Sequence, residues 1–400
     1  MSENSKFDLA RLLHPVSTAT FFGEYWEEKP LLVSRKRRDY YASLLTLAQI
    51  DPLITVLPAD TVFLTNSDAP LDVGEFARAD ASLADASLDV VRACQLFAGG
   101  ATFVIRDAHK RLGSLAALCR ELEREIGAPS QTNLYMTPAH GKGFDTHYDT
   151  HDVLVLQVAG SKEWTIFDSP VRLPLNGQPF DAKVHTAGAA TMSFVLHAGD
   201  FLYIPRGFLH HGRSGDETSL HATIGILSYR WADVMLEVMA QMCLSDPEFR
   251  RALPVGLGRP DFDTASARRT FADLLSRAVA QASADRVLDR IADEFVVSRH
   301  ALVPGQLEQV SLSQNLTAMD EVGVRPATIY RLRADGEVIR IRSHGREISL
   351  PAEAADTVRY ALENERYAVR DIPGDFDDEV KLIIVRRLIE EGLVWKLAGR

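Results

Sequence analysis

The sequence lacks the features that mark a membrane protein or a disulfide-stabilised secreted protein. No apolar run in its 400 residues approaches the roughly 18 residues of a membrane span. Only three cysteines occur, Cys94, Cys119 and Cys243, and none forms a C-x-x-C pair. This count excludes a disulfide framework and favours a reducing compartment. The first 13 residues have no basic segment followed by an apolar one, so we expect no secretory signal. These absences predict a soluble, cytoplasmic protein with no membrane partner.

Basic charge is also scarce. The chain has 44 Lys+Arg against 55 Asp+Glu, a formal net charge of −11. A general nucleic-acid binder would normally have a basic balance. Residues 323–400 contain 14 basic and 14 acidic side chains, which gives that segment no basic excess either. We therefore expect no sequence-specific DNA binding, and a weak preference for a basic partner.

Residues 100–229 have a mostly β texture. Short strand candidates follow one another without alternating helices, which favours an antiparallel sandwich or barrel over a parallel sheet. Turn signals separate them, such as Ala159-Gly160-Ser161 and Ala198-Gly199-Asp200. One amphipathic helix, 112–126, interrupts the series. The strand candidates are 101–106, 133–137, 146–159, 163–168, 191–196, 201–204 and 218–229.

The segments on either side have other textures. Near the N-terminus, Ser17 or Thr18 is a suitable N-cap for an aromatic-rich helix, and 29–33 is a short strand candidate. From 231 to about 297 the apolar pattern becomes helical. Residues 323–400 resemble a small α+β unit, with strands near 328–332 and 338–341 and helices near 354–363 and 379–391. The helical stripe consists of Phe271, Leu274, Leu275, Ala278, Val279, Leu288, Ile291 and Phe295.

The segment Thr146-His147-Tyr148-Asp149 carries the first candidate site. On a strand His147 and Asp149 would point to the same face and Tyr148 to the other. A third metal ligand would have to come from a neighbouring strand, and His210 follows about sixty residues later in a Pro-x-Gly-x-x-His segment. Two histidines and one carboxylate leave three coordination positions open, as in non-haem iron(II) oxygenases. The sequence therefore predicts a metal site with room for a cosubstrate and dioxygen.

Lys162 extends this hypothesis. It begins the strand after the 159–161 turn, so it could return beside His147. A lysine inside a β-barrel without an acidic partner is energetically costly, and an anionic ligand opposite it would offset the cost. 2-Oxoglutarate, chelating the metal at one end, carries such an anionic group at the other. Lys162 is therefore the expected anchor for its distal carboxylate.

The neighbouring residues are given less specific roles. His210 is preferred over His211 as the ligand because of the Pro-x-Gly-x-x-His spacing. His151 shares the parity of His147 and is interpreted as a polar rim residue. Arg206, in a turn, is expected to be solvated or salt-bridged rather than bound to substrate. Four apolar residues are assigned to the barrel core and not to a substrate platform: Trp164, Ile166, Phe194 and Leu196.

Several segments together resemble the JmjC-type cupin oxygenases, and most of all the ribosomal oxygenase branch. The resemblance rests on residues 25–32, 100–102, 133–138, 147–149, 156–164 and 199–210. It implies a double-stranded β-helix (cupin/JmjC jelly-roll) barrel at 1–229. A helical dimerisation domain at 230–322 and a winged-helix-like α+β domain at 323–400 would follow.

The resemblance also implies roles for individual residues. His147, Asp149 and His210 match the Fe(II) ligands, and Lys162 matches the residue that holds 2-oxoglutarate. Four further positions match the cosubstrate pocket and its surroundings: Asn133, Tyr135, His221 and Thr223.

The implied activity is hydroxylation of a protein side chain, histidine or arginine of a ribosomal protein, by a homodimeric enzyme that uses Fe(II), 2-oxoglutarate and O2. Alternatives with the same chemistry are action on a small peptide or metabolite, or N-methyl-lysine demethylation. An alternative of another class is a non-catalytic metal-binding cupin that serves as a regulatory module.

Overall fold

The computed structural model describes residues 7–66, 69–78, 87–141 and 143–397. The chain divides into two compact units, Met1–Ser228 and Tyr229–Arg400, which are described separately below. Among the described residues, no helix has the length and apolar character needed to cross a membrane.

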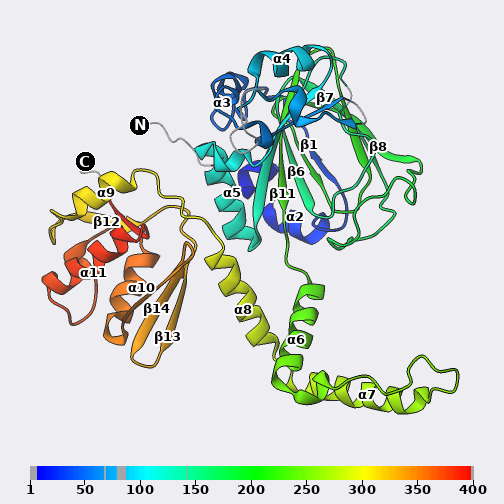
Figure 1. Ribbon diagram of the computed structural model, residues 1–400. Coiled ribbons are helices and arrows are strands. Elements are labelled where there is room, and N and C mark those ends of the chain that lie inside the picture. Colours follow the sequence, from blue (N-terminus) through cyan, green and yellow to red (C-terminus); the bar gives the residue numbers. More distant parts are fainter. Residues whose placement is uncertain (1–6, 67–68, 79–86, 142, 398–400) are drawn as a thin grey trace. The chain divides into compact units, whose positions relative to one another are not determined.

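The first unit is built on two antiparallel sheets (Figure 1). The strands of the larger sheet are β1 (Leu31–Val33), β2 (Val62–Asn66), β3 (Ala69–Pro70), β4 (Thr102–Ile105), β5 (Ser130–Thr137), β6 (Asp152–Ala159), β9 (Phe201–Ile204) and β11 (Ser219–Ile226). Those of the smaller sheet are β7 (Ser161–Phe167), β8 (Ala190–His197) and β10 (His210–Ser214). The strand order is β1-β9-β6-β11-β5-β4-β2-β3 in the larger sheet and β10-β7-β8 in the smaller. The prediction of a β-rich cupin-type barrel is confirmed.

Strand β6 shows how the sequence produces two apolar cores. Its residues alternate faces, as in any strand. Val153 and Val155 face the smaller sheet and pack with Trp164, Ile166 and Leu196 between the sheets. The intervening Leu154 and Leu156 belong to the core on the other face of the larger sheet. Both faces of β6 are therefore buried, which explains why its sequence is almost continuously apolar.

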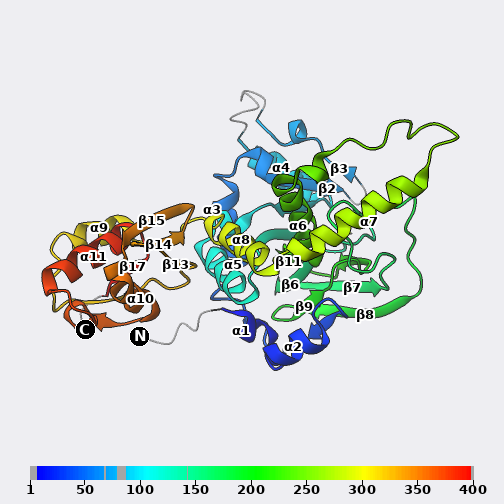
Figure 2. The ribbon, with the colours of Figure 1, turned by 90° about the horizontal axis from the view of Figure 1, so that it is seen from below.

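Five helices contribute to the outer core of this unit: α1 (Leu9–Leu13), α2 (Thr18–Glu24), α3 (Ile50–Ile54), α4 (Val90–Ala98) and α5 (Gly113–Ile126). The Ser17 hydroxyl accepts the Thr20 N–H at 3.0 Å and caps α2, as one of the two predicted caps would. Helix α5 packs beside β5, while β7 and β8 lie on the side away from it (Figures 1 and 2).

The predicted strands differ from the observed ones at the two places that carry the candidate ligands. The single strand expected over 146–159 is wrong in its first part, because β6 begins only at Asp152. The strand β10, which begins at His210, was not predicted. Its sequence, His-His-Gly-Arg-Ser, has none of the residue types enriched in strands, which are Val, Ile, Thr, Tyr, Phe and Trp, so its pairing with β7 makes it a strand.

The second unit begins with the helices α6 (Trp231–Ser245), α7 (Thr264–Gln281) and α8 (Ala284–Val297). The apolar stripe predicted over 271–295 is divided between α7 and α8, because a new helix starts where Ser283 accepts the Arg286 N–H at 3.3 Å. On α7 the stripe lies open: Phe271, Leu275 and Val279 are 68%, 48% and 74% exposed. Their spacing of four residues places them on one face.

The remainder of the second unit is an α+β arrangement around its own core. It contains α9 (Gln306–Ser313), α10 (Ala355–Glu363) and α11 (Asp378–Glu390). One sheet has the order β16 (Tyr367–Ala368), β12 (Glu321–Val324), β17 (Val394–Lys396). The other consists of β13 (Arg331–Asp335), β14 (Val338–Ser343) and β15 (Arg346–Pro351). The winged-helix-like character and the three-domain division stay predictions.

Candidate metal and cosubstrate site

Two chain segments bring the candidate metal ligands together. The His147 N–H donates to the His210 carbonyl at 3.2 Å, and the His210 N–H donates to the His147 carbonyl at 2.8 Å. This pair is an isolated antiparallel bridge, and no regular strand surrounds His147. Residues directly opposite each other on paired backbones have neighbouring side chains. The bridge therefore places the two imidazoles side by side, with ring centroids 4.6 Å apart.

Backbone carbonyls orient both imidazole rings. Nδ1 of His147 lies 2.6 Å from the Asp145 carbonyl oxygen, and Nδ1 of His210 lies 3.0 Å from that of Phe208. A carbonyl only accepts, so in each ring Nδ1 carries the proton and donates it. The Nε2 atom of each ring is then unprotonated and available to a metal, which is the usual arrangement of metal-binding histidines.

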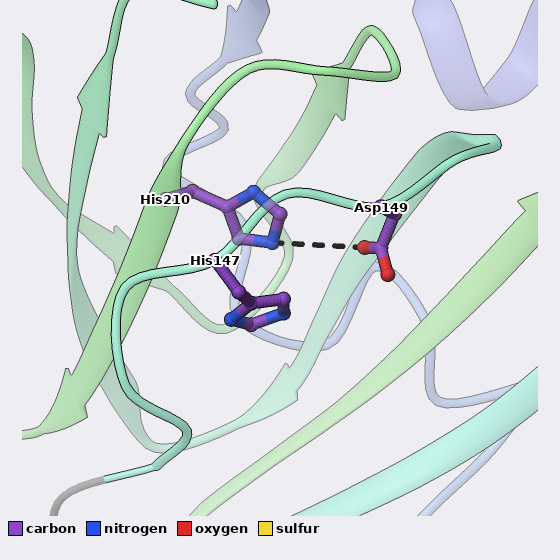
Figure 3. A group of neighbouring side chains, drawn as sticks. All are labelled: His147, Asp149 and His210. Carbon is purple, nitrogen blue, oxygen red and sulfur yellow. Dashed lines mark ion pairs between the residues drawn. The ribbon is translucent and has the colours of Figure 1, made fainter. Parts of the chain in front are cut away.

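Asp149 completes the triad (Figure 3). The potential ligand atoms of His147, Asp149 and His210 all lie within 4.8 Å of one another, and Nε2 of His210 is 3.7 Å from a carboxylate oxygen of Asp149. Burial acts to raise the pKa of Asp149, but the nearby histidines His151, His210 and His147 hold it below the usual value. Burial, and then the neighbouring His147, lower the pKa of His210.

The donor set fits one divalent cation. It presents a carboxylate oxygen and one ring nitrogen from each of two imidazoles to a common point. Three such ligands on one face leave the other positions of an octahedral ion open, as Fe(II) oxygenases require.

A cavity of about 70 Å³ opens beside the triad, between the two sheets. One water molecule needs roughly 10–15 Å³ of such space, so the cavity has room for a few waters or one small molecule. Lys162 of β7 reaches into it and is only 4% exposed. Burial lowers the pKa of Lys162 to about 7. Within the described part of the chain, no carboxylate forms an ion pair with this amine.

Two glycines make room for the Lys162 side chain. A Cβ atom on Gly212, in β10, would lie 2.8 Å from Lys162 Cε, and one on Gly143 would lie 3.1 Å from Nζ. Both distances are shorter than ordinary contacts between carbon and its neighbours. The chain therefore holds a buried, unpaired cation in a closely fitted channel that ends in the cavity. These residues fit an anionic group of a small ligand beside the metal.

The other predicted cosubstrate residues divide into two groups. Tyr135, His221 and Thr223 line the cavity, and the rings of Tyr135 and His221 stack at 4.9 Å. Burial, and then Lys162, lower the pKa of His221 well below its usual value. Asn133 is not among the residues that line the cavity. Its side-chain oxygen accepts the Asp107 N–H at 3.1 Å, so its contact with a cosubstrate stays a prediction.

The structure also places the residues that were given secondary roles. Tyr148 is buried and its hydroxyl donates to the Gln178 carbonyl at 3.0 Å, which agrees with its expected direction away from the metal. The His211 ring bonds the Thr146 hydroxyl at 2.8 Å. Trp164 belongs to the core as predicted, yet it also lines the cavity.

Phe144 was missed by the sequence reasoning. Its ring lines the cavity and meets Tyr135 edge-on at 5.8 Å. It lies in irregular backbone, where no periodic pattern indicates the direction of a side chain.

Comparison with known proteins agrees with this geometry. Residues 109–234 match the family model of the JmjC domain. The chain therefore contains a JmjC domain, and all three triad residues lie inside the matched segment.

Among curated proteins, the chain is similar along most of its length to proteins named as ribosomal oxygenases. It is 25% identical to ribosomal oxygenase 1 of Danio rerio, over 96% of this chain and 78% of the relative. It is 29% identical to ribosomal oxygenase 1 of Gallus gallus, over 90% of this chain and 62% of the relative. A Dictyostelium discoideum relative named bifunctional lysine-specific demethylase and histidyl-hydroxylase NO66 is 26% identical, over 96% of this chain and 82% of its own.

Among solved structures, Escherichia coli YcfD has the same fold. One structure has a TM-score of 0.56 at 15% identity and covers 96% of this chain and 99% of YcfD. Another holds YcfD, described as a ribosomal oxygenase, with cobalt and 2-oxoglutarate, at a TM-score of 0.54 and 16% identity.

Proposed function

We propose that this chain is an Fe(II)- and 2-oxoglutarate-dependent oxygenase that hydroxylates a side chain of a protein. The JmjC domain, the relatives named as ribosomal oxygenases and the 2-His-1-carboxylate triad all support this function. When bound, iron and 2-oxoglutarate supply the oxidising chemistry: the cosubstrate becomes succinate and carbon dioxide, and one oxygen atom of O2 enters a C–H bond of the substrate.

The observation that carries the proposal is Lys162. A metal-binding or regulatory cupin has no need of a buried amine without an ion-pair partner beside its metal ligands. Burying such a charge is costly unless a counter-charge arrives. A dicarboxylate bound to the metal through one end would bring the other carboxylate into the same cavity. Lys162 therefore favours an oxygenase over the alternative of a non-catalytic metal-binding cupin.

The side chains divide the remaining work. His147, Asp149 and His210 hold the metal, with both imidazoles fixed in the ligating tautomer by carbonyls. Lys162 binds and orients the cosubstrate. Tyr135, His221 and Thr223 bound the space around it, and Val153, Val155 and Trp164 form an apolar part of the cavity wall.

The proposed substrate is a histidine or arginine side chain of a ribosomal protein. The names of the relatives support this choice, and the net charge of −11 suits a basic partner. One relative's name also includes lysine demethylation, which would need the same metal site. Mass spectrometry of ribosomal proteins from cells with and without this protein separates the two outcomes: hydroxylation adds one oxygen, and demethylation removes a methyl carbon. Finding neither on any ribosomal protein would reject the substrate class.

Turnover of 2-oxoglutarate tests the reaction class. We expect Fe(II)-dependent succinate release by the wild type and its loss in His147→Ala and Asp149→Ala. His197→Ala is the matched control, because His197 is an exposed histidine of β8 outside the cavity. Undiminished turnover in the two ligand variants would reject the assignment.

We further propose that the exposed stripe on α7 contacts a second copy of the chain. Phe271, Leu275 and Val279 are open to solvent on one helix face, and isolated apolar stripes of this kind mark interaction surfaces. Light scattering is expected to give a dimer for the wild type and for Arg268→Ala, which changes an exposed residue of the same helix. Phe271→Glu is expected to give a monomer. A monomeric wild type would reject this proposal.

Two further predictions carry over from the sequence. A cytoplasmic location is proposed on the basis of the sparse cysteines, and we propose that the unit at 323–400 recruits or packs against protein rather than DNA. The arginines of its β13–β14 hairpin support the second point, because Arg331, Arg333 and Arg342 all pair with Asp293 of α8. Salt-sensitive duplex binding at physiological ionic strength would contradict it.

A further inference from the structure

A buried cluster of charged residues lies next to the metal triad and is not used by it. Arg206, in the turn after β9, is 5% exposed and Asp152, at the start of β6, is fully buried. The guanidinium donates to an Asp152 carboxylate oxygen at 3.0 Å and also pairs with Glu27. The Tyr203 hydroxyl donates to the other Asp152 oxygen at 2.9 Å. One arginine thus connects β6, β9 and the N-terminal segment.

Buried ion pairs are a weak source of fold stability. Withdrawing two charges from water is so costly that well-packed apolar residues of similar size often serve the fold equally well or better. The cluster lies beside the outer apolar core, to which Tyr203 and Trp26 belong, and an apolar pair could pack there. A buried charged cluster at this place therefore calls for a role other than stability, and its geometry suggests one.

The cluster joins the two segments that supply the metal ligands. Asp152 follows Asp149 by three residues, and Arg206 precedes His210 by four. Besides the ion pair, the Arg206 N–H approaches an Asp152 oxygen at 3.4 Å, and the Gly207 N–H donates to the Asp149 carbonyl at 3.0 Å. These contacts hold the Asp149 backbone at a fixed distance from the turn that precedes His210. The backbone bridge between His147 and His210 holds the same two segments together at a second point.

Gly207 shows how closely this turn is fitted. Its φ of +90° is a left-handed conformation that favours glycine. A Cβ atom there would lie 2.5 Å from the Val171 carbonyl and 2.6 Å from the Ser169 hydroxyl. The turn therefore packs against the 169–174 loop and bonds to Asp149, and Arg206 ties it to Asp152 and Glu27.

Glu27 ties the N-terminal segment to the same point. Its backbone N–H donates to the Tyr203 hydroxyl at 2.8 Å, and that hydroxyl donates onward to Asp152. The neighbouring Trp26 ring stacks on Tyr203 with centroids 5.8 Å apart. The segment before β1 is thus linked to β9, to the start of β6 and to the turn that holds Arg206.

We propose that Arg206 is a positioning residue for the metal centre: through Asp152 and Glu27 it holds the Asp149 and His210 segments at the separation that a metal needs, and so sets the metal affinity. This inference rests on the proposed function only in assuming that His147, Asp149 and His210 bind a divalent metal. Residues that orient metal ligands typically change the affinity 10–100-fold when they are removed.

The test measures binding of Mn²⁺ alone, with free Mn²⁺ followed by electron paramagnetic resonance, together with the melting temperature of the metal-free protein. The main variant combines Arg206→Met with Asp152→Asn, which removes both buried charges at once. The matched control combines Arg213→Met with Glu163→Gln, an exposed cross-strand pair on β10 and β7. A third variant, Arg206→Lys, keeps the positive charge but lacks the planar guanidinium that pairs with both Asp152 and Glu27.

We expect the main variant to melt at or above the wild-type temperature and to bind Mn²⁺ 10–100-fold more weakly. The control pair should bind like the wild type, and Arg206→Lys should lie between. Unchanged Mn²⁺ affinity in the main variant would overturn the proposal. A second combination of results would also overturn it: the main variant melts at a much lower temperature, and Glu27→Gln binds Mn²⁺ as tightly as the wild type. The cluster would then stabilise the fold without affecting the metal site.

Glu27→Gln keeps the test decisive if the main variant does not fold. Glu27 is the solvent-facing end of the cluster, with a third of its side chain exposed, so its loss leaves the core intact. We expect its Mn²⁺ affinity to fall several-fold. A wild type that binds no Mn²⁺, or binds it equally well as His147→Ala, would refute the proposed metal site itself, and that result is distinct from a failure of the positioning role.

Discussion

Replacing Lys162 with methionine should stabilise the ligand-free fold while it abolishes cosubstrate binding. The amine is 4% exposed and burial lowers its pKa from 10.5 to about 7. Each pKa unit corresponds to about 1.4 kcal/mol, so the protonated amine costs the folded state about 5 kcal/mol. Methionine has a similar length and no charge, so it removes this cost. For a unit of this size the gain is worth about 10–20 °C in melting temperature.

The effect should depend on pH in a defined direction. Below pH 7 the amine is protonated in both the folded and the unfolded chain, so the cost is full and constant. Between pH 7 and 10.5 the folded chain loses the proton first, and the cost of Lys162 shrinks as the pH rises. The stability advantage of Lys162→Met is therefore largest at pH 6–7 and should narrow toward pH 9.

The assay is thermal unfolding with and without Mn²⁺ and 2-oxoglutarate. A ligand present at 100 times its Kd stabilises the folded state by about 2.7 kcal/mol. The wild type should gain this increment only when metal is present, and Lys162→Met should gain nothing from 2-oxoglutarate. Lys183→Met, at an exposed loop lysine, should behave like the wild type. The reasoning is refuted if Lys162→Met melts below the wild type at pH 6.5 and still responds to 2-oxoglutarate.

Two further substitutions follow from close contacts in the site. Gly212→Ala would place a Cβ atom 2.8 Å from Lys162 Cε and displace the amine, so 2-oxoglutarate should stabilise this variant less while Mn²⁺ stabilises it as before; equal cosubstrate stabilisation would contradict the fitted channel. Tyr148→Phe removes the hydroxyl that donates to the Gln178 and Pro179 carbonyls, a loss of about 1 kcal/mol from the anchoring of the 168–189 loop. Limited proteolysis in that loop should quicken in this variant, and an unchanged cleavage rate would show that the hydroxyl does not hold the loop.

The sequence predicted regular strands better than it predicted the ligand segments. Residues 201–204 were expected as a strand and form β9 with the same bounds, because the run is apolar on both faces and turns flank it. The segment 146–151 was expected to continue into β6 but is irregular, with a single bridge at His147. The alternation of side chains along a strand does not show where the neighbouring backbone stops pairing. In this segment the strand-like pairing is limited to the bridge between His147 and His210.

The candidate site also contains residues that the sequence could predict and contacts that it could not. His147, Asp149 and His210 could be named from residue type and spacing together with the family resemblance, and the structure brings their ligand atoms within 4.8 Å of one another. The channel around Lys162 could not, because the reason for Gly143 and Gly212 is a close approach across the fold. The ion pair of Arg206 was expected in general terms, but its partners lie 54 and 179 residues away. No local pattern identifies such partners.

The central claim is that this chain uses O2 to convert 2-oxoglutarate at the His147, Asp149 and His210 site. The most direct test is to supply ¹⁸O-labelled dioxygen with Fe(II) and 2-oxoglutarate and to measure the label in the succinate. The account predicts one labelled oxygen in the succinate formed by the wild type, and no labelled succinate from Asp149→Ala. Unlabelled succinate from the wild type, or equal labelling by the variant, would contradict it.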